Sequence, residues 1–291
     1  MGLSKRRGNF GLLGDDASTL YRPMMCSRVK AQPMQIVTWN VNSLKARREY
    51  VSLFLDEVSP DVLCVQELKL ETHKVPRELF ESRGYHLAVH GQKQWNGVLI
   101  ASKAPLTDVV CGFDGEESQS RLVSARTGGV RLINLYCPQG QAEDSPKFAY
   151  KLRFFERLNA WVRENCAADE PLVLTGDINI APEADDVWDV SQFENVPTYH
   201  PKEHEAWAEL LAFGLKDVVK PHLSPNTYSF WDYRKARFRF DKGMRIDHHL
   251  LTAPLAERVT GAGVYRDWRK VKGELKASDH APVWITLGEG G

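Results

Sequence analysis

The sequence predicts an α/β fold in which mixed β-sheets pack face to face and helices cover their outer faces. Short apolar runs bounded by Gly, Pro and Asp recur along the chain and are typical of strands. Between them, apolar residues spaced at i, i+3 and i+4 predict amphipathic helices. No repeat, linker or shift in composition follows residue 34, so we expect one domain over residues 34–291.

Strands are predicted where apolar runs lie between turn residues. Some runs, such as Val62-Leu63-Cys64-Val65, are apolar throughout and indicate strands buried on both faces. Those between residues 86 and 136 follow one another closely and indicate antiparallel pairing. The predicted strands cover residues 35–39, 61–65, 86–90, 97–101, 121–125, 130–136, 171–175, 227–231, 245–252 and 281–287.

Three helices are predicted from their apolar spacing. The clearest covers residues 146–165 and places its apolar side chains on one face. A shorter helix covers residues 50–58, and a third at 203–213 ends at Gly214, which suits a C-cap. The long connections are expected at 73–83, as a loop or short helix, and at 182–199, as a polar loop.

The charge balance restricts how the protein meets a polyanion. With 38 basic and 38 acidic residues the formal charge is zero, so any such site must be local. Residues 1–33 hold six basic and two acidic residues and lack the apolar core of a secretory signal. We predict that they form a disordered extension.

Composition also bears on location. No stretch approaches the ~20 consecutive apolar residues of a membrane helix, so we expect no membrane association. Five cysteines without a CxxC pair favour free thiols in a reducing cytoplasm. Nothing in the sequence indicates self-pairing, so we expect a monomer.

Polar side chains stand where several strands end. Gly176-Asp177-Ile178-Asn179 follows the apolar run 171–175, and Ser278-Asp279-His280 precedes the last strand. Side chains at strand ends are held rigidly yet face a crevice, so an acid and an amide two residues apart can aim at one reacting atom. The residues of this kind are Asn40, Asn42, Glu67, Tyr136, Asp177, Asn179, Asp247, Asp279 and His280.

This residue set suits metal-assisted hydrolysis. Carboxylates and amides with one histidine and no thiolate cluster favour a hard cation such as Mg²⁺ or Mn²⁺. Such an ion neutralises a phosphate and lowers the pKa of water, which phosphodiester hydrolysis requires. Taken singly, the residues have simpler explanations: turn residues, Tyr136 as a core aromatic, or Asp247 as a partner of Arg245.

Two histidine patterns carry less weight. His200-Pro201-Lys202-Glu203-His204 fits the H-x-x-E-H zinc pattern, but Pro201 suits the first turn of a helix and places His200 before it. His248 and His249 lie inside an apolar strand, where we expect satisfied core histidines and not ligands.

A series of motifs occurs in this order: Thr38-Trp39-Asn40-Val41-Asn42, Leu63-Cys64-Val65-Gln66-Glu67-Leu68-Lys69, His90-Gly91-Gln92-Lys93, Tyr136-Cys137-Pro138-Gln139-Gly140, Gly176-Asp177-Ile178-Asn179, Phe230-Trp231-Asp232-Tyr233-Arg234, Gly243-Met244-Arg245-Ile246-Asp247 and Ser278-Asp279-His280-Ala281-Pro282-Val283. In these motifs, and over residues 34–287, the sequence resembles the exonuclease III/AP endonuclease family of the endonuclease/exonuclease/phosphatase superfamily. The resemblance implies a DNase I-like four-layered sandwich, two packed β-sheets between helices, with a metal site at one edge of the sheets.

The resemblance also implies roles for the strand-end residues. Glu67 would be the main metal carboxylate, supported by Asn42 and Asp279. Asp177 would orient and deprotonate the attacking water.

The other strand-end residues would act on the phosphate. Asn40 and Asn179 would hold it together with the water. His280, oriented by Asp247, would donate to a non-bridging phosphate oxygen, and Tyr136 would stabilise the phosphate or the leaving group.

DNA contacts are expected from an aromatic and basic segment. Residues 230–240 interleave aromatic and cationic side chains, which suits an unstacked sugar or base and neighbouring phosphates. A strand with buried aromatics explains the same pattern. The resemblance places this segment beside a pocket for the abasic sugar and favours DNA contacts by Phe230, Trp231, Arg234, Met244 and Gln139.

We therefore expect a Mg²⁺-dependent DNA-repair nuclease that acts on double-stranded DNA 5′ of abasic sites and at damaged 3′ ends, as 3′→5′ exonuclease, 3′-phosphodiesterase and 3′-phosphatase. The alternatives are a phosphomonoesterase or phospholipid hydrolase of the same fold, or a non-catalytic nucleic-acid-binding relative. Residues 181–199, His200 and the turn 94–96 depart from the best-known family members, so the balance of activities stays open.

Overall fold

The computed structural model describes residues 33–113 and 119–289, so the predicted extension lies outside the described residues except for Pro33. The described part forms two six-stranded sheets. In spatial order the first contains β11 (Val259–Val264), β12 (Val283–Leu287), β1 (Met34–Asn40), β2 (Val62–Gln66), β4 (Val98–Ser102) and β3 (His86–His90). The second contains β5 (Thr107–Cys111), β6 (Leu122–Thr127), β7 (Val130–Tyr136), β8 (Leu172–Asp177), β10 (Asp247–Thr252) and β9 (Leu215–Asp217).

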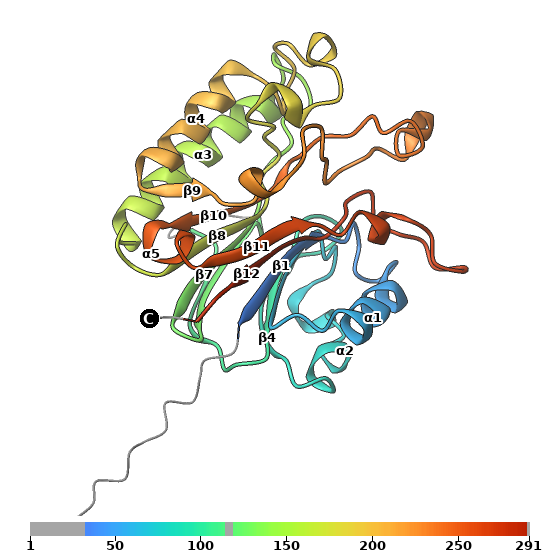
Figure 1. Ribbon diagram of the computed structural model, residues 1–291, viewed down its shortest axis with the longest axis vertical. Helices are drawn as coiled ribbons and strands as arrows, with labels where there is room; N and C mark the ends of the chain where they lie inside the picture. The colour runs from blue at the N-terminus through green and yellow to red at the C-terminus, as the bar shows by residue number, and fades with distance from the viewer. Residues whose placement is uncertain (1–32, 114–118, 290–291) are drawn as a thin grey trace, which may run out of the picture. The chain divides into compact units, whose positions relative to one another are not determined.

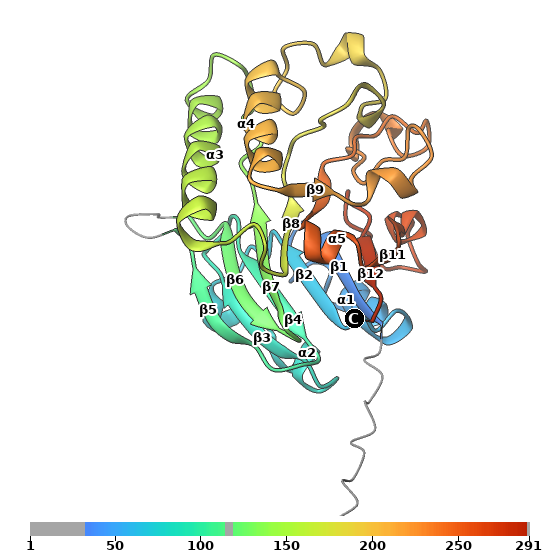
Figure 2. The same ribbon diagram turned by 60° about the vertical axis from the view of Figure 1, so that its left-hand side comes forward.

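Helices cover the outer faces of both sheets (Figures 1 and 2). Helices α1 (Arg48–Glu57) and α2 (Glu78–Glu81) lie on the first sheet, and α3 (Pro146–Asn165) and α4 (Pro201–Ala212) lie on the second. The short helix α5 (Ala253–Ala256) follows β10 directly. Single 3₁₀ turns lie at Thr72–Lys74, Ala184–Asp186, Val190–Gln192, Lys220–His222, Arg234–Ala236 and Arg266–Arg269.

The apolar runs explain the layers. Neighbouring residues of a strand point to opposite faces, so Ile36 joins the core between the sheets while Val37 joins the core beneath α1. A third core lies between the second sheet and α3, where Leu174 and Phe155 are buried. Three cores separate four layers, which confirms the predicted four-layered sandwich.

Several predicted boundaries change. Residues 227–231 form no ladder, and Phe230 makes only isolated bridges to Met244 and His280. Helix α4 begins two residues earlier than expected, since His200 is its N-cap. Strand β10 begins at Asp247 instead of Arg245.

Three strands were not predicted: β5, β9 and β11. Strand β5 is largely exposed and β9 has three residues, so neither presents a clear apolar run. Strand β11 contains Gly261 and Gly263, residues that usually weaken a strand. Here they make room for the Trp284 ring, which would lie 3.1 Å from a Cβ at Gly263.

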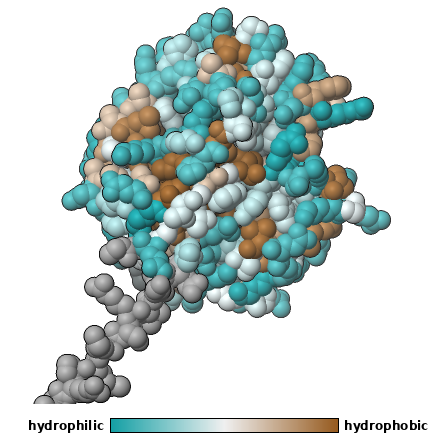
Figure 3. Space-filling model, in the orientation of Figure 1, coloured by the Kyte–Doolittle hydropathy of each residue, from teal (hydrophilic) through white to brown (hydrophobic). Residues whose placement is uncertain are grey.

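On the face drawn in Figure 3, hydrophilic side chains surround small, separate hydrophobic patches. Within residues 33–113 and 119–289, no helix has the length and apolarity needed to cross a membrane.

Candidate active site

Four strand ends meet at one edge of the sandwich. Strand β1 pairs parallel with β2, and β7 pairs parallel with β8, so Tyr136 lies beside Asp177 at the ends of β7 and β8. Strand β10 runs antiparallel to β8, which sets its first residue, Asp247, opposite Asp177. Side chains from both sheets therefore converge on Asp177.

Asp177 is buried at the end of β8 and lies within reach of Asn40. Asn40 Nδ2 donates to Asp177 Oδ2 (2.8 Å) and to Glu67 Oε1 (3.0 Å), so one amide joins the two carboxylates. The backbone N–H of Asn179 donates to Asp177 Oδ1 (3.1 Å). Burial raises the pKa of Asp177 to about 7, with His280 opposing this rise and Asp247 adding to it.

Glycine at position 176 allows this arrangement. Its φ is +137°, and a Cβ there would lie 2.0 Å from the carbonyl oxygen of Leu135. Only glycine lets β8 approach β7 so closely just before the carboxylate. Asn179 follows with φ +57°, a left-handed conformation that asparagine tolerates.

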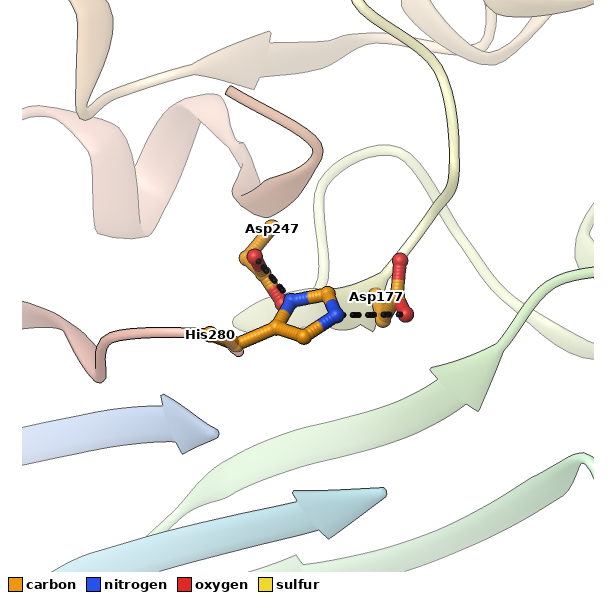
Figure 4. Close-up of side chains that lie close together, drawn as sticks. All are labelled: Asp177, Asp247 and His280. Carbon is orange, nitrogen blue, oxygen red and sulfur yellow. Dashed lines mark hydrogen bonds and ion pairs between the residues drawn. The ribbon is translucent and has the colours of Figure 1, made fainter. Parts of the chain in front are cut away.

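His280 lies between two carboxylates (Figure 4). Its Nδ1 is 2.9 Å from Asp247 Oδ2, and its Nε2 is 3.7 Å from Asp177 Oδ2. Burial alone lowers the pKa of His280, but the charges of Asp247 and Asp177 outweigh it and raise the pKa to about 10. The ring is therefore an imidazolium at neutral pH and can donate a proton.

Asp247 is itself held in place by Ser229. Ser229 Oγ donates to Asp247 Oδ2 (2.6 Å) and accepts the backbone N–H groups of Ile246 and Asp247. The alternative of an Asp247–Arg245 pair is not realised, because Arg245 binds Asp186 (2.7 Å) and Asp217 (2.6 Å).

A second group of oxygen donors surrounds Lys69. Its ammonium is 2.8 Å from Glu67 Oε2 and 2.5 Å from Asn42 Oδ1, and Asn42 Nδ2 donates to Asp279 Oδ1 (3.0 Å). Burial favours neutral Glu67, but Lys69 outweighs this and lowers the pKa of Glu67. The Lys69 ammonium thus lies between a carboxylate oxygen and an amide oxygen. Such oxygens are the ligands that fit a hard divalent cation.

The backbone at these donors is unusual. Asn42 and Glu67 have φ of +44° and +54°, in the left-handed region. Glutamate rarely adopts this conformation, and such residues cluster at functional sites. The strain supports a binding role for the Glu67 loop.

Asp177, Asp247 and His280 form another cluster whose ligand atoms lie within 4.8 Å of one another. The group around Glu67 consists of carboxylate and amide oxygens, which fit a hard divalent cation better than a cluster that includes an imidazole does.

Tyr136 completes the edge. Burial raises the pKa of Tyr136 well above its usual value, and the carboxylates of Glu67 and Asp177 raise it further. The phenol therefore stays protonated and can donate a hydrogen bond. The Arg121 guanidinium lies 4.9 Å from the centre of its ring.

Comparison with known proteins identifies the family of the chain. Residues 37–280 match the model of the Endonuclease/Exonuclease/phosphatase family. The chain belongs to this family. It is 32% identical to Exodeoxyribonuclease III of Haemophilus influenzae over 267 residues, which cover 86% of this chain and 98% of that protein.

Solved structures of family members are also similar. The 3′ phosphatase NExo from Neisseria, bound to a product DNA hairpin, superposes with a TM-score of 0.83 at 37% identity, covering 87% of this chain and 99% of that one. An AP endonuclease from Archaeoglobus fulgidus gives the same TM-score and identity, with the same coverage. These matches confirm the resemblance to the exonuclease III/AP endonuclease family.

Some of the residues predicted to contact DNA lie at the site and others lie on the surface near it. The ring centroids of Phe230 and His280 are 4.8 Å apart, and the Phe230 backbone bridges to Met244, so Phe230 and Met244 lie at the site. Gln139 is exposed beside it, and the side chain of Arg234 is 85% exposed and paired with Asp232.

Trp231 departs from the prediction. Its side chain is 0% exposed, and its Nε1 donates to Asp241 Oδ1 (3.0 Å). It packs against Phe238, with ring centroids 5.1 Å apart, so no ring surface is free to contact DNA. At Trp231, the alternative of a buried core aromatic therefore describes the structure, and not a contact with DNA.

The histidine patterns form no zinc site. His200 caps α4 through Nδ1, which accepts from Lys202 N (3.1 Å), while Glu203 pairs with Lys151. His248 and His249 are buried core histidines, as predicted, and their Nε2 atoms reach backbone carbonyls of Ile180 (2.8 Å) and Val283 (3.0 Å).

Three supporting residues were given no role from the sequence. Lys69 stands two positions after Glu67 inside a quoted motif, and Ser229 precedes Phe230 without any distinguishing signal. Lys151 interrupts the apolar stripe of α3 between Phe148 and Phe155, which is a signal for a buried charge.

Proposed function

We propose that this family member is a DNA-repair nuclease that hydrolyses phosphodiester bonds 5′ of abasic sites and trims blocked or normal 3′ ends of double-stranded DNA. Support comes from relatives described as an exodeoxyribonuclease, a 3′ phosphatase and an AP endonuclease. One observation carries the proposal: the Asn40 amide donates to both Glu67 and Asp177. The pKa of Asp177 is about 7, and this carboxyl lies beside the His280 imidazolium.

The residues divide the chemistry between them. Asp177 takes a proton from the attacking water, and its pKa of about 7 suits a general base near neutral pH. His280, held by Asp247, donates to a phosphate oxygen, and the neutral phenol of Tyr136 donates a second hydrogen bond. Asn40 and Asn179 orient the carboxylate.

We propose Mg²⁺, with Mn²⁺ as a substitute, as the metal, held by Glu67, Asn42 and Asp279. When bound, such an ion neutralises phosphate charge and lowers the pKa of water. Lys69 adds a positive charge among these residues.

The test uses two duplexes, one with a single abasic site and one with a 3′-phosphate at a nick. Both should be cleaved in Mg²⁺ and left intact in chelator. Glu67→Gln and Asp177→Asn should lose activity. The control is Glu71→Gln, four residues after Glu67, which should keep activity because Glu71 pairs only with Lys74 among the described residues. Cleavage that persists in chelator or in either active-site variant contradicts the mechanism.

The salt response separates DNA from small substrates. Phosphate contacts release counterions, so the affinity for DNA should fall steeply as salt rises. A flat response, with hydrolysis of a free phosphomonoester or of a phospholipid, would favour the phosphatase alternatives.

We also propose that the protein acts as a monomer in the cytoplasm. The four cysteines in the described residues are all free thiols, which suits a reducing compartment. Sedimentation at two protein concentrations tests the oligomeric state.

A further inference from the structure

Trp95 is the most exposed large hydrophobic side chain of the described residues, at 66%. A single exposed aromatic is common and needs no explanation by itself. Trp95 differs because it stands at the rim of a cavity of about 700 Å³ that reaches Tyr136 of the active site. A cavity of this size lies within the range that holds small-molecule ligands, ~300–1,000 Å³.

The turn that carries Trp95 is fixed to the active-site loop. Gln94 and Asn96 have positive φ, +69° and +55°, and the carbonyl of Asn96 accepts the backbone N–H of Lys69 (2.9 Å). Asn96 Nδ2 also donates to Gln92 Oε1 (3.2 Å). The backbone of the turn that carries Trp95 is therefore bonded to Lys69, two residues after Glu67.

The cavity walls carry the other groups that a nucleotide needs. Amide side chains of Gln92, Gln139 and Gln141 line it, together with the cations Arg121 and Lys147. Arg121 donates to the neutral acceptors Gln119 Oε1 (2.7 Å) and Tyr136 O (3.0 Å). Neither cation forms an ion pair with a carboxylate of the described residues, so their charge is available to a phosphate.

Stacking geometry decides which nucleotide fits. Inside a duplex, both faces of each base are covered by its neighbours. An indole can stack only on a base that is unpaired or terminal, and such stacking is the usual way in which proteins hold single strands.

We propose that Trp95 stacks on an unpaired base of the cleaved strand, and that this cavity holds a nucleotide that has left the duplex beside the scissile phosphate. The inference rests on the proposed nuclease function and adds to it a preference for mismatched or frayed ends over fully paired ones. Arg121 and Lys147 bind the phosphates of that nucleotide, and the amides contact its base edge.

The test compares two duplexes of the same length, one fully paired and one with two mismatched nucleotides at a 3′ end. Binding is measured by fluorescence anisotropy in chelator, where no cleavage occurs, and kcat and KM are measured in Mg²⁺. Trp95→Ala should weaken binding of the mismatched duplex about 5- to 150-fold, the equivalent of ~1–3 kcal/mol per stacked base. Binding of the paired duplex should change less than about twofold.

Two further variants complete the design. Trp95→Phe keeps an aromatic face and should recover most of the lost affinity. Val271→Ala removes a side chain of similar exposure, 64%, that does not line the cavity, and should behave like the unaltered protein.

The outcomes separate this inference from the proposed function. Absence of cleavage of either duplex by the unaltered protein in Mg²⁺ contradicts the nuclease function. If cleavage is normal and Trp95→Ala binds both duplexes as tightly as the unaltered protein does, the stacking role alone is overturned. An equal loss of affinity for both duplexes overturns it as well.

Discussion

Lys151→Met is expected to lower the free energy of unfolding by ~3–5 kcal/mol and to reduce kcat more than it changes KM. Lys151 and Glu203 form an ion pair in which both side chains are 0% exposed. The ammonium also donates to the carbonyls of Asn179 (2.7 Å) and Gln139 (3.2 Å). It therefore connects α3 to both strand-end loops of the active site.

The magnitude follows from what the substitution leaves behind. Burial lowers the pKa of Lys151 and Glu203 opposes this, so the two charges compensate each other inside the protein. Removing one partner leaves the other buried without a counter-charge, which costs ~3–5 kcal/mol. Each carbonyl also loses a charged donor, worth roughly 1.5–3 kcal/mol. These losses overlap, because one ammonium makes all the contacts, so they do not add.

A double variant separates stability from positioning. Lys151→Met with Glu203→Gln removes both charges and keeps an oxygen for the backbone N–H groups of Thr198 (2.7 Å) and His200 (3.2 Å). It should recover much of the stability but not kcat, because the Asn179 loop still lacks its anchor.

Urea unfolding gives the free energies, and initial rates on the abasic duplex give kcat and KM. The control is Arg163→Met, which breaks the exposed Arg163–Glu209 pair (3.7 Å) between the same two helices and should cost less than ~1 kcal/mol. If the double variant recovers kcat along with stability, Lys151 does not position the active site. If Lys151→Met costs no more than the control, the pair has no energetic importance.

Three further predictions concern the site itself. Asp247→Asn removes the charge that raises the pKa of His280 to about 10, so the alkaline limb of the pH–rate profile should move to lower pH. The raised pKa of His280 stabilises the folded protein fully below the ordinary value of ~6.5, and this stabilisation is lost as pH rises through about 10. The variant should therefore lose stability at lower pH than the unaltered protein. An alkaline limb of the pH–rate profile that does not move would exclude His280 as the proton donor. Gly176→Ala should unfold at lower temperature than Gly84→Ala, because both pay the ~1–3 kcal/mol of left-handed strain but only the former meets a backbone oxygen at 2.0 Å; equal midpoints would contradict this. Glu67→Gln should weaken Mn²⁺ binding, followed by electron paramagnetic resonance without DNA, by at least the ~10–100-fold typical of losing a supporting residue, and unchanged binding would place the metal elsewhere.

Much of the fold could be predicted because several of its strands are apolar throughout. Strands such as β2 are buried on both faces, so the run Val62 to Val65 is visible without any partner. Strand β9 has three residues and β11 contains two glycines, so their stability depends on neighbours that the local sequence does not reveal. The same holds for Trp231, whose burial depends on packing against Phe238 and bonding to Asp241.

The site could be predicted as a set of residues but not as a geometry, because the geometry depends on register. Asn40 and Asp177 are 137 positions apart, and they meet because parallel pairs in two different sheets end at one edge. Asp247 reaches His280 only because β10 pairs with β8 so that Asp247 lies opposite Asp177. A slip of one residue between these strands would turn Asp247 to the opposite face of the sheet and leave the His280 imidazole without its nearest carboxylate. The largest opposing influence on the pKa of His280 would then be lost, and only the charges of Asp177 and Asp279 would oppose the lowering by burial. The proton donor is thus a property of the β8–β10 register, and that register is maintained by the two cores on either side of the second sheet.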